Sequence, residues 1–593
     1  MRYKSKSNGY ELLTEDELLQ KLLESRGVKD YKHLLNVSSK DVYDGKLFVN
    51  MDKGLELLHK AIKLNKTIAV IQDCDVDGLC SSSNITYYIK DIDNGMKINI
   101  VFHEGKEHGI ILKDLEDVEY DLLIVPDAGS SDVKQIKELK SQGKDILILD
   151  HHNYDTTIDT EAVIINCKDG AYPNPTLSGA GVTYKFCKEY DKKYNYNFAD
   201  KYLDLVAVGN IADSMDLTNY ETRYLTLEGL KILKEGNGNI MFQEILKKNN
   251  IENPTITDVN YKIAPFINAS TRVGTLEEKM NLFKSVMGSD EKVEYQPRRK
   301  HKDDPKPPVE YVTIQKDMTR QLTNIKSRQD KLVKQGMEEL INKIEKEKLD
   351  NNKIIIVDGT ETIKQTFSGL VANKIADKYK RPALILREQN NYCYGGSGRN
   401  YKLFEIENLN NFLKEIDVFE SVDGHDNAFG FKLKKERLDN LISLVNHELV
   451  NTKIDDTYHV DYSIPVGRLK EKHIKQVGRW EGIWGNNLSE PLFAITGIAI
   501  TEEDISLLGE KKNVLKITKQ IGSQNFSFIK LHSNIEEYNK IIGREMKGLK
   551  KKTKKRINME IVGTFKINQF NGNEYPQINI IDYNISEVRK LEF

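Results

Sequence analysis

Four short apolar segments, at 68–71, 98–102, 122–125 and 146–149, constrain the fold of this chain more than any other feature. Stretches of helical length separate them, and acidic or turn residues bound each one. Continuous apolar strands joined by helices are typical of a parallel sheet covered on both faces. The pattern therefore predicts an α/β fold, in which ligands bind at the carboxyl ends of the strands.

Periodicity and composition divide the whole chain into five predicted parts. They are a helical amino-terminal region with the α/β core at 1–287, a proline-bearing linker or loop at 288–314, a connecting helix at 315–348, a second α/β unit at 349–453, and a mostly β region at 454–593. An apolar stripe at three- and four-residue spacing predicts the long helix. Short strands with an Asn571-Gly572 turn predict a small barrel in the last part.

Composition limits the class of protein. The five cysteines form no Cys-x-x-Cys pair, which fits a reduced compartment, so we expect a cytoplasmic protein and, by default, a monomer. No apolar run has transmembrane length and no signal peptide is recognisable, so no membrane partner is expected. The net charge of −2 does not point to nucleic acid, and the basic runs at 298–302 and 547–556 are by themselves typical of solvated surface.

Carboxylates and imidazoles follow the predicted strands of the first sheet. They are Asp73, Asp75 and Asp77 after the first strand, Asp127 after the third, and Asp150, His151 and His152 after the fourth. Parallel strands bring these residues to one edge, and an apolar helical stretch can return Asp213 to the same place. Such a donor set suits Mn²⁺ or Mg²⁺, and so many acids cannot stay ionised together without cations. Two metal ions held here can clamp a phosphoryl oxygen and activate water.

Each of these elements also has a simpler explanation. The Asp-x-Asp-x-Asp-Gly segment resembles a calcium loop, but Asn84 stands where an EF-hand needs glutamate, and the segment follows a strand. A single Asp at a strand end is often a helix N-cap, and a His-His pair is more often structural than metal-binding. Four such elements at consistent topological positions favour a metal site.

The four elements together resemble the successive motifs of the DHH phosphoesterases. The matching segments are Asp73-x-Asp75-x-Asp77-Gly78, Asp127-Ala128-Gly129, Asp150-His151-His152 and Ile211-Ala212-Asp213. The resemblance implies two divalent ions, Mn²⁺ or Mg²⁺, bound by Asp73, Asp75, Asp77, Asp127, His151 and Asp213. It places His152 beside the scissile phosphate, as an electrostatic stabiliser or proton donor, and gives Asp150 the role of orienting a histidine. The predicted catalytic residues are accordingly His152, Asp150 and Asp73.

Further segments resemble the RecJ branch of this superfamily. The segments 25–28 and 177–182 match its amino-terminal signature and the stretch after its third motif, and 264–269 with Arg272 matches its Ala-Pro-x-Ile-Asn-Ala-x-x-Arg stretch. The second α/β unit resembles the DHH-associated domain through 396–399 and 424–430. The substrate-binding residues that this implies are Asn268, Arg272, Ser397, Gly398, Arg399 and His425. Two departures are Asp423 in place of a glycine, and Gln72-Asp73-Cys74 in place of Gly-Asp-Tyr.

The segments 568–572 and 577–582 of the carboxyl-terminal region resemble the final hairpin of the oligonucleotide-binding fold of RecJ. Phe526, Phe528, Phe570 and Tyr575 are candidates for stacking on bases, although we expect at least half of them to lie in the core. On such a fold the basic run 550–556 becomes a candidate for phosphate contact.

The resemblance implies a 5′→3′ exonuclease that hydrolyses single-stranded DNA to 5′-mononucleotides, in DNA repair, recombination or replication. It also implies a channel between the two α/β domains and partners such as a single-strand-binding protein. The alternatives are a phosphodiesterase for short oligonucleotides or cyclic dinucleotides, which needs no barrel, and an inactive single-strand-binding scaffold, which would have lost metal ligands.

Overall fold

The computed structural model describes residues 1–7, 13–104, 107–297, 299, 304–452, 457–543, 557–570 and 572–587. The chain packs as two compact units, Val37–Ile454 and Met1–Asn36 with Asp455–Phe593. Residues 1–36 thus pack with the last part of the chain, whereas the sequence placed them in the 1–287 domain. The basic run 547–556 and most of 298–302 lie outside the described residues, as do Asn571 and the side chains of His425 and Phe570.

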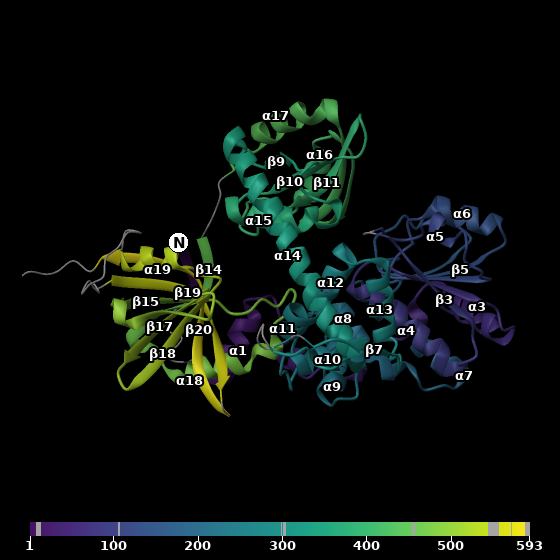
Figure 1. Ribbon diagram of the computed structural model, residues 1–593, viewed down its shortest axis with the longest axis horizontal. Coiled ribbons are helices and arrows are strands. Elements are labelled where there is room, and N and C mark those ends of the chain that lie inside the picture. The colour runs from purple at the N-terminus through teal and green to yellow at the C-terminus, as the bar shows by residue number, and fades with distance from the viewer. Residues whose placement is uncertain are drawn as a thin grey trace, which may run out of the picture. The chain divides into compact units, whose positions relative to one another are not determined.

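The first sheet of the larger unit is parallel throughout, as predicted (Figure 1). Its order is β3 (Ile98–Phe102), β2 (Ile68–Gln72), β4 (Leu122–Pro126), β5 (Asp145–Asp150) and β6 (Val163–Asn166). The four predicted strands are confirmed, and β6 is an addition that is only four residues long. Because β2, β4 and β5 are almost fully buried on both faces, their apolar runs are continuous.

Helices cover both faces of this sheet, and further helices follow the last strand in the chain. They are α3 (Met51–Lys63), α4 (Val76–Ile92), α5 (Leu112–Leu115), α6 (Val133–Ser141), α7 (Gly179–Tyr194), α8 (Leu203–Ala212), α9 (Tyr220–Lys234), α10 (Ile240–Lys248), α11 (Ile256–Asp258), α12 (Ala264–Val273) and α13 (Leu276–Val286). α4 is buried along nearly its whole length, between α7 and α8 among others. A helix fixed on all sides can hold the residues at its first turn rigidly.

The segment predicted as a linker at 288–314 instead contains a small antiparallel hairpin. Its strands are β7 (Lys292–Tyr295) and β8 (Glu310–Thr313). Each has four residues, too few to give a recognisable strand pattern in a polar stretch. The long helix α14 (Ile314–Glu347) follows, within one residue of the predicted bounds. Its buried stripe includes Leu322, Ile325 and Leu340, as the spacing predicted.

The second α/β sheet follows α14 and is mixed. Its order is β12 (Phe419–His425), β13 (Ala428–Lys434), β11 (Cys393–Arg399), β10 (Ala383–Glu388) and β9 (Ile355–Asp358), with helices α15 (Ser368–Tyr379), α16 (Leu409–Glu415) and α17 (Leu438–Glu448). Only β9 and β10 are parallel to each other. The predicted second α/β unit is therefore present.

The smaller unit is built on one eight-stranded sheet. Its order is β1 (Arg2–Ser7), β14 (Thr457–Pro465), β15 (Phe493–Ile500), β19 (Ile557–Phe570), β20 (Asn573–Glu587), β18 (Gln524–Leu531), β17 (Val514–Ile521) and β16 (Ile505–Leu508). Helices α1 (Glu15–Glu24), α2 (Tyr31–Leu35), α18 (Glu471–Arg479) and α19 (Ile535–Ile542) accompany it. In the described part of the chain β1 and β16 do not pair, so the predicted barrel is open. Phe526 and Phe528 are fully buried and Tyr575 is 48% exposed, so half of the four stacking candidates are core residues.

The amino-terminal motif at 25–28 has a structural role within this unit. The Arg26 guanidinium donates to both carboxylate oxygens of Asp461 on β14, at 3.0 and 3.2 Å, and lies over the ring of Trp484. Both charged side chains are about 95% buried. Arg26, in the segment that resembles the RecJ signature, therefore holds the residues after α1 against the sheet.

Two further expectations concern the whole chain. All five cysteines are buried and none forms a disulfide. Among the helices of the described ranges, none combines the length and apolar character that a membrane span requires.

Candidate metal centre

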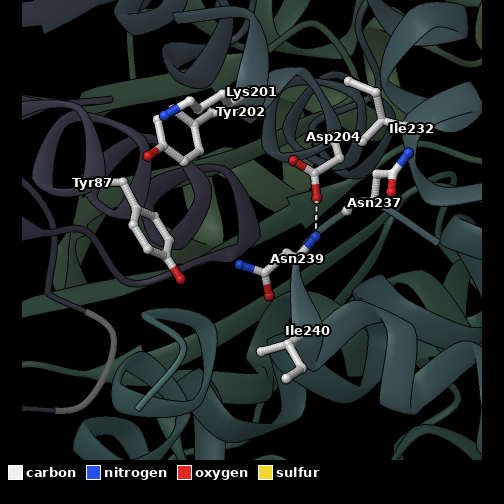
Figure 2. Close-up of a pocket in the computed structure, with 9 residues that line it drawn as sticks. Tyr87, Lys201, Tyr202, Asp204, Ile232, Asn237, Asn239 and Ile240 are labelled. Carbon is white, nitrogen blue, oxygen red and sulfur yellow. Dashed lines mark hydrogen bonds between the residues drawn. The ribbon is translucent and has the colours of Figure 1, made fainter. Parts of the chain in front are cut away.

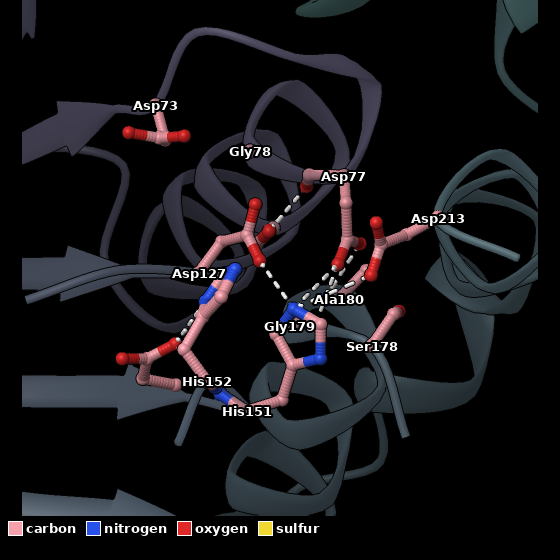
Figure 3. Close-up of polar contacts among 12 residues, drawn as sticks. Asp73, Asp77, Gly78, Asp127, His151, His152, Ser178, Gly179, Ala180 and Asp213 are labelled. Carbon is pink, nitrogen blue, oxygen red and sulfur yellow. Dashed lines mark hydrogen bonds and ion pairs between the residues drawn. The ribbon is translucent and has the colours of Figure 1, made fainter. Parts of the chain in front are cut away.

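Five segments of the larger unit meet at the carboxyl edge of the parallel sheet (Figure 3). Asp73 and Asp75 follow β2, Asp77 lies in the first turn of α4, and Asp127 follows β4. His151 and His152 follow β5, and Asp213 directly follows α8. The convergence expected from parallel strands is therefore present for every predicted ligand.

His151 lies at the middle of the cluster. Its Nε2 atom is 3.1 Å from Asp127 Oδ1, 3.5 Å from Asp213 Oδ2 and 3.8 Å from Asp77 Oδ2. Three sets of side chains each place one donor atom within 4.8 Å of the others: Asp73 with Asp75 and Asp127, Asp77 with His151 and Asp213, and Asp127 with His151 and His152. The first two sets are consistent with two adjacent cation positions.

The electrostatics of the cluster favour bound cations. Burial and the charges of neighbouring carboxylates raise the pKa of Asp127 and of Asp213 well above the usual range, and raise that of Asp77 to about 6. Two buried carboxylate oxygens, Asp127 Oδ1 and Asp213 Oδ2, receive no hydrogen bond among the described residues. Uncompensated buried oxygens of this kind are costly, and a divalent cation would neutralise them. The donor set of carboxylates and one imidazole fits Mn²⁺ or Mg²⁺.

The amino terminus of α7 positions Asp77. The Gly179 and Ala180 amides donate to the two oxygens of Asp77 at 2.6 and 3.0 Å. Small residues allow this approach, because a Cβ at Gly209 would collide with Asp77 Oδ1 and one at Gly179 would lie 2.7 Å from the Asp127 Cα. The segment at 177–182 thus supports the ligands.

Replacing Gly179 by alanine is expected to weaken Mn²⁺ binding by roughly 10- to 100-fold, the cost typical of disturbing residues that orient metal ligands. The added methyl group must displace Asp127, whose backbone is already in the left-handed region at φ 67°. Isothermal titration with Mn²⁺ measures the effect. Gly467→Ala, where nothing lies within 4 Å of the new Cβ, is the matched control. Unchanged affinity in Gly179→Ala would contradict this role.

Asp150 holds the histidine pair instead of facing the ligands. Its Oδ1 atom accepts from the His151 and His152 amides, at 2.7 and 3.1 Å, and from His152 Nδ1 at 2.9 Å. Although burial opposes it, hydrogen bonding and charge from His152 hold the pKa of Asp150 well below its usual value. The same contact outweighs burial at His152 and raises its pKa. With Nδ1 engaged, Nε2 of the partly exposed His152 is left for a substrate.

Comparison with known proteins identifies the family. Residues 67–210 match the DHH family N-terminal domain, and residues 460–582 match the RecJ OB domain. The chain is 34% identical over 581 residues, 97% of each sequence, to YorK of Bacillus subtilis (strain 168), an SPbeta prophage-derived protein provisionally named a single-strand DNA-specific exonuclease. This chain belongs to the RecJ family. The predicted family and enzyme class are thereby confirmed.

Other RecJ proteins are more distant. The Bacillus subtilis single-stranded-DNA-specific exonuclease RecJ is 24% identical over 586 residues, which cover 96% of this chain and 68% of that protein. The crystal structure of Thermus thermophilus RecJ in complex with Mn²⁺ superposes with a TM-score of 0.69 at 19% identity, over 99% of this chain and 79% of that one. A complex with Mg²⁺ gives 0.64 at 17% identity, and both likenesses support the fold.

Two of the substrate-binding residues predicted from RecJ lie near each other. Burial lowers the pKa of Arg272, on α12, against the opposing charge of Asp75. Burial and the charge of Arg272 lower the pKa of Arg399, at the end of β11, to about 10. Two partly desolvated guanidinium groups beside an acidic cluster form a favourable place for a phosphate.

The other predicted contacts are less direct. Ser397 Oγ lies 2.8 Å from Ser368 Oγ, and Asn268 is half-buried on α12. Gly398 has a packing reason for its size, since a Cβ there would collide with the ring of Phe429. The His425 side chain lies outside the described residues.

The two departures from the RecJ pattern leave the backbone intact. Asp423 is exposed and pairs with Gly430 within a continuous β12, so the missing glycine does not interrupt the strand. Gln72 is buried and its side-chain amide donates to the Asp73 backbone oxygen.

His108 is a residue of the centre that sequence reasoning missed. Its Nδ1 atom lies 2.7 Å from Asp73 Oδ2, and its ring centroid is 5.1 Å from that of His152. The hydrogen bond with Asp73 and the charge of that carboxylate outweigh burial and raise the pKa of His108 to about 9. The available signal was its place after β3, because the carboxyl end of that strand lies at the same edge of the sheet as those of β2, β4 and β5. Asn166, at the end of β6, was missed too; it donates to the His152 backbone oxygen at 2.9 Å.

Proposed function

We propose that this chain is a metal-dependent exonuclease that removes 5′-mononucleotides from single-stranded DNA in the 5′→3′ direction. The observation that carries the proposal is that all six predicted metal ligands, Asp73, Asp75, Asp77, Asp127, His151 and Asp213, lie at one edge of the sheet. An inactive scaffold would not retain every ligand. The names of the relatives support the substrate class, and membership of RecJ supports the direction.

The side chains of this chain have distinct roles in the proposed hydrolysis. Bound divalent ions would supply an activated water and neutralise charge on the reacting phosphate. His152, held by Asp150, presents Nε2 to the scissile phosphate as a hydrogen-bond or proton donor. Arg272 and Arg399 hold the phosphate oxygens of the strand.

The surrounding domains would select and retain the strand. We propose that the α/β domains 37–287 and 349–453 form a channel that admits one strand, and that the OB-like region within 454–593 also binds single-stranded DNA. We further propose that the enzyme is cytoplasmic and monomeric. It would act in DNA repair, recombination or replication, beside a single-strand-binding protein.

The pH dependence tests the role of His152. Because Asp150 raises the pKa of His152, an acid function of His152 persists to higher pH than for an ordinary histidine. In Asp150→Asn the carboxylate charge is lost, so the alkaline limb of the kcat profile is expected to move to lower pH. Steady-state rates across pH, with Asp117→Asn on the exposed surface as control, measure this. An alkaline limb that does not move would exclude His152 as the proton donor.

A substrate panel tests the proposed function itself. The protein is incubated with Mn²⁺ or Mg²⁺ and with single-stranded DNA labelled at either end, duplex DNA, single-stranded RNA and dinucleotides. Stepwise loss from the 5′ end of single-stranded DNA is the expected result. Cleavage of dinucleotides alone would support phosphodiester hydrolysis at this site but contradict single-stranded DNA as the substrate. Binding of single strands without any cleavage would favour the inactive scaffold.

A further inference from the structure

Figure 2 shows a pocket, whose volume is about 470 Å³. It lies at the opposite end of α8 from the metal centre. Asp204, which lines it, stands at the second position of α8, whereas Asp213 follows the last. Asp213 lies nine positions after Asp204, which along a helix corresponds to about 13 Å. The volume lies within the range of small-ligand sites, and none of the metal-centre residues lines this pocket.

One wall of the pocket is aromatic and fixed in place. The rings of Tyr87 and Tyr202 stack at 5.1 Å with an interplanar angle of 15°. The Tyr87 hydroxyl donates to the Val286 backbone oxygen at 2.6 Å, and that of Tyr202 donates to Asp91 at 2.8 Å. Both hydroxyls are engaged, so this wall offers a ligand flat apolar surface whose position is already set.

A buried carboxylate contributes the main polar group. Asp204 is 2% exposed, and its Oδ2 atom accepts the Asn239 amide at 2.5 Å. The second oxygen points away from Asn239 (Figure 2). Burial raises the pKa of Asp204 to about 6, so the group is mainly ionised at neutral pH and accepts hydrogen bonds. Asn237, on an exposed turn beside it, adds a side-chain amide.

The remaining lining restricts the kind of ligand. Ile232 and Ile240 add aliphatic surface, and Ile240 is 50% exposed. Lys201 at the pocket is paired with Asp91 at 2.9 Å, so it does not balance the Asp204 charge. An anionic group would be repelled from the buried carboxylate, and a purely apolar ligand would add no donor to the backbone amides that Asp204 already accepts. A flat ring with N–H donors on its edge can pack its faces against the apolar walls and donate a hydrogen bond to the carboxylate.

We propose that this pocket binds a nucleobase that carries an exocyclic amino group, as adenine and cytosine do. The ring faces pack against the Tyr87–Tyr202 wall and the two isoleucines, and the amino group donates to Asp204. Thymine is disfavoured, because its edge has two carbonyl oxygens beside a single N–H. The base can belong to a free nucleoside or to a DNA strand, and the site is independent of the proposed hydrolysis.

Titration of nucleosides into full-length Asp213→Ala protein in EDTA tests the proposal, since cleavage and binding at the metal centre are then absent. Deoxyadenosine and deoxycytidine should bind with millimolar or tighter affinity, and thymidine about tenfold more weakly. Ile240→Trp fills the pocket from an exposed position and should weaken binding of the amino nucleosides at least about tenfold. Met280→Trp, in a neighbouring pocket and also exposed, is the matched control.

A short oligodeoxyadenylate separates the two sources of the base. Tighter binding than deoxyadenosine, lost in Ile240→Trp, assigns the site to a base within a strand; equal binding of both assigns it to the free nucleoside. Equal affinity for thymidine, no measurable binding of any nucleoside, or binding that Ile240→Trp leaves unchanged overturns the proposal. Equal thermal midpoints of the tryptophan variants and their parent show that any loss is local.

Discussion

Asp127→Asn is expected to abolish hydrolysis and at the same time to raise the thermal midpoint of the metal-free protein. The activity loss should reach about 10³-fold or more, comparable to removing one group that stabilises charge in a transition state. The stability gain arises because Asp127 is buried among Asp73, Asp75 and Asp77, whose charges and burial raise its pKa. Asparagine removes one charge and tolerates the positive φ of this position.

Mn²⁺ should reverse the order of stability. Wild type gains a large increase in thermal midpoint from the ion, whereas Asp127→Asn gains little. A carboxyl group with a raised folded-state pKa loses its stabilising contribution as pH rises through that pKa. Because burial and the neighbouring carboxylates raise the pKa of Asp127 well above its usual value of about 4, the advantage of the variant in EDTA should grow as pH rises from about 4 towards that raised pKa, and it should vanish at lower pH. A variant that is less stable than wild type in EDTA would show that the protein itself compensates Asp127.

Arg26→Ala is expected to destabilise the smaller unit by about 3–5 kcal/mol, the cost of leaving one member of a buried ion pair without its partner. Asp461, whose side chain is 4% exposed in the wild type, would keep the Leu492 amide at 2.9 Å and the Ser25 hydroxyl at 3.4 Å, with the charge of Lys6 at 3.8 Å, and would lose the buried guanidinium. Urea unfolding followed by the fluorescence of Trp480 and Trp484, both in this unit, measures the change.

Lys6→Ala provides the control for Arg26. Lys6 also faces Asp461, at 3.8 Å, but its side chain is 42% exposed, so its removal should cost less than about 1 kcal/mol. If both variants lost a similar free energy of unfolding, the burial of the Arg26–Asp461 ion pair would contribute nothing to stability. Arg26→Lys should recover only part of the stability, because one ammonium cannot donate to both oxygens and cover Trp484.

The metal centre was predictable because its ligands stand at positions that topology fixes. Once 68–71, 122–125 and 146–149 are parallel neighbours, Asp73, Asp127 and Asp150 must lie at one edge. His108 was not predictable in the same way, because its contact with Asp73 depends on the path of the loop after β3. The same holds for Asn166, which acts through the His152 backbone.

The limits in the rest of the fold have similar causes. β1 pairs with β14, more than 450 residues away, and neither segment indicates its partner. The motif at Arg26 suggested a family but no role, since Asp461 joins it only in the folded chain. The packing of Gly398 against Phe429 likewise depends on strand register. Local patterns predicted elements and strand ends, whereas contacts between distant segments required the structure.

The most direct test of the account is to locate the metal. Crystals grown with Mn²⁺ and measured at the manganese absorption edge would show bound ions as anomalous density peaks. Two peaks are expected, one among Asp73, Asp75 and Asp127 and one among Asp77, His151 and Asp213. No peak at this edge of the sheet, or Mn²⁺ bound only elsewhere, would contradict this expectation.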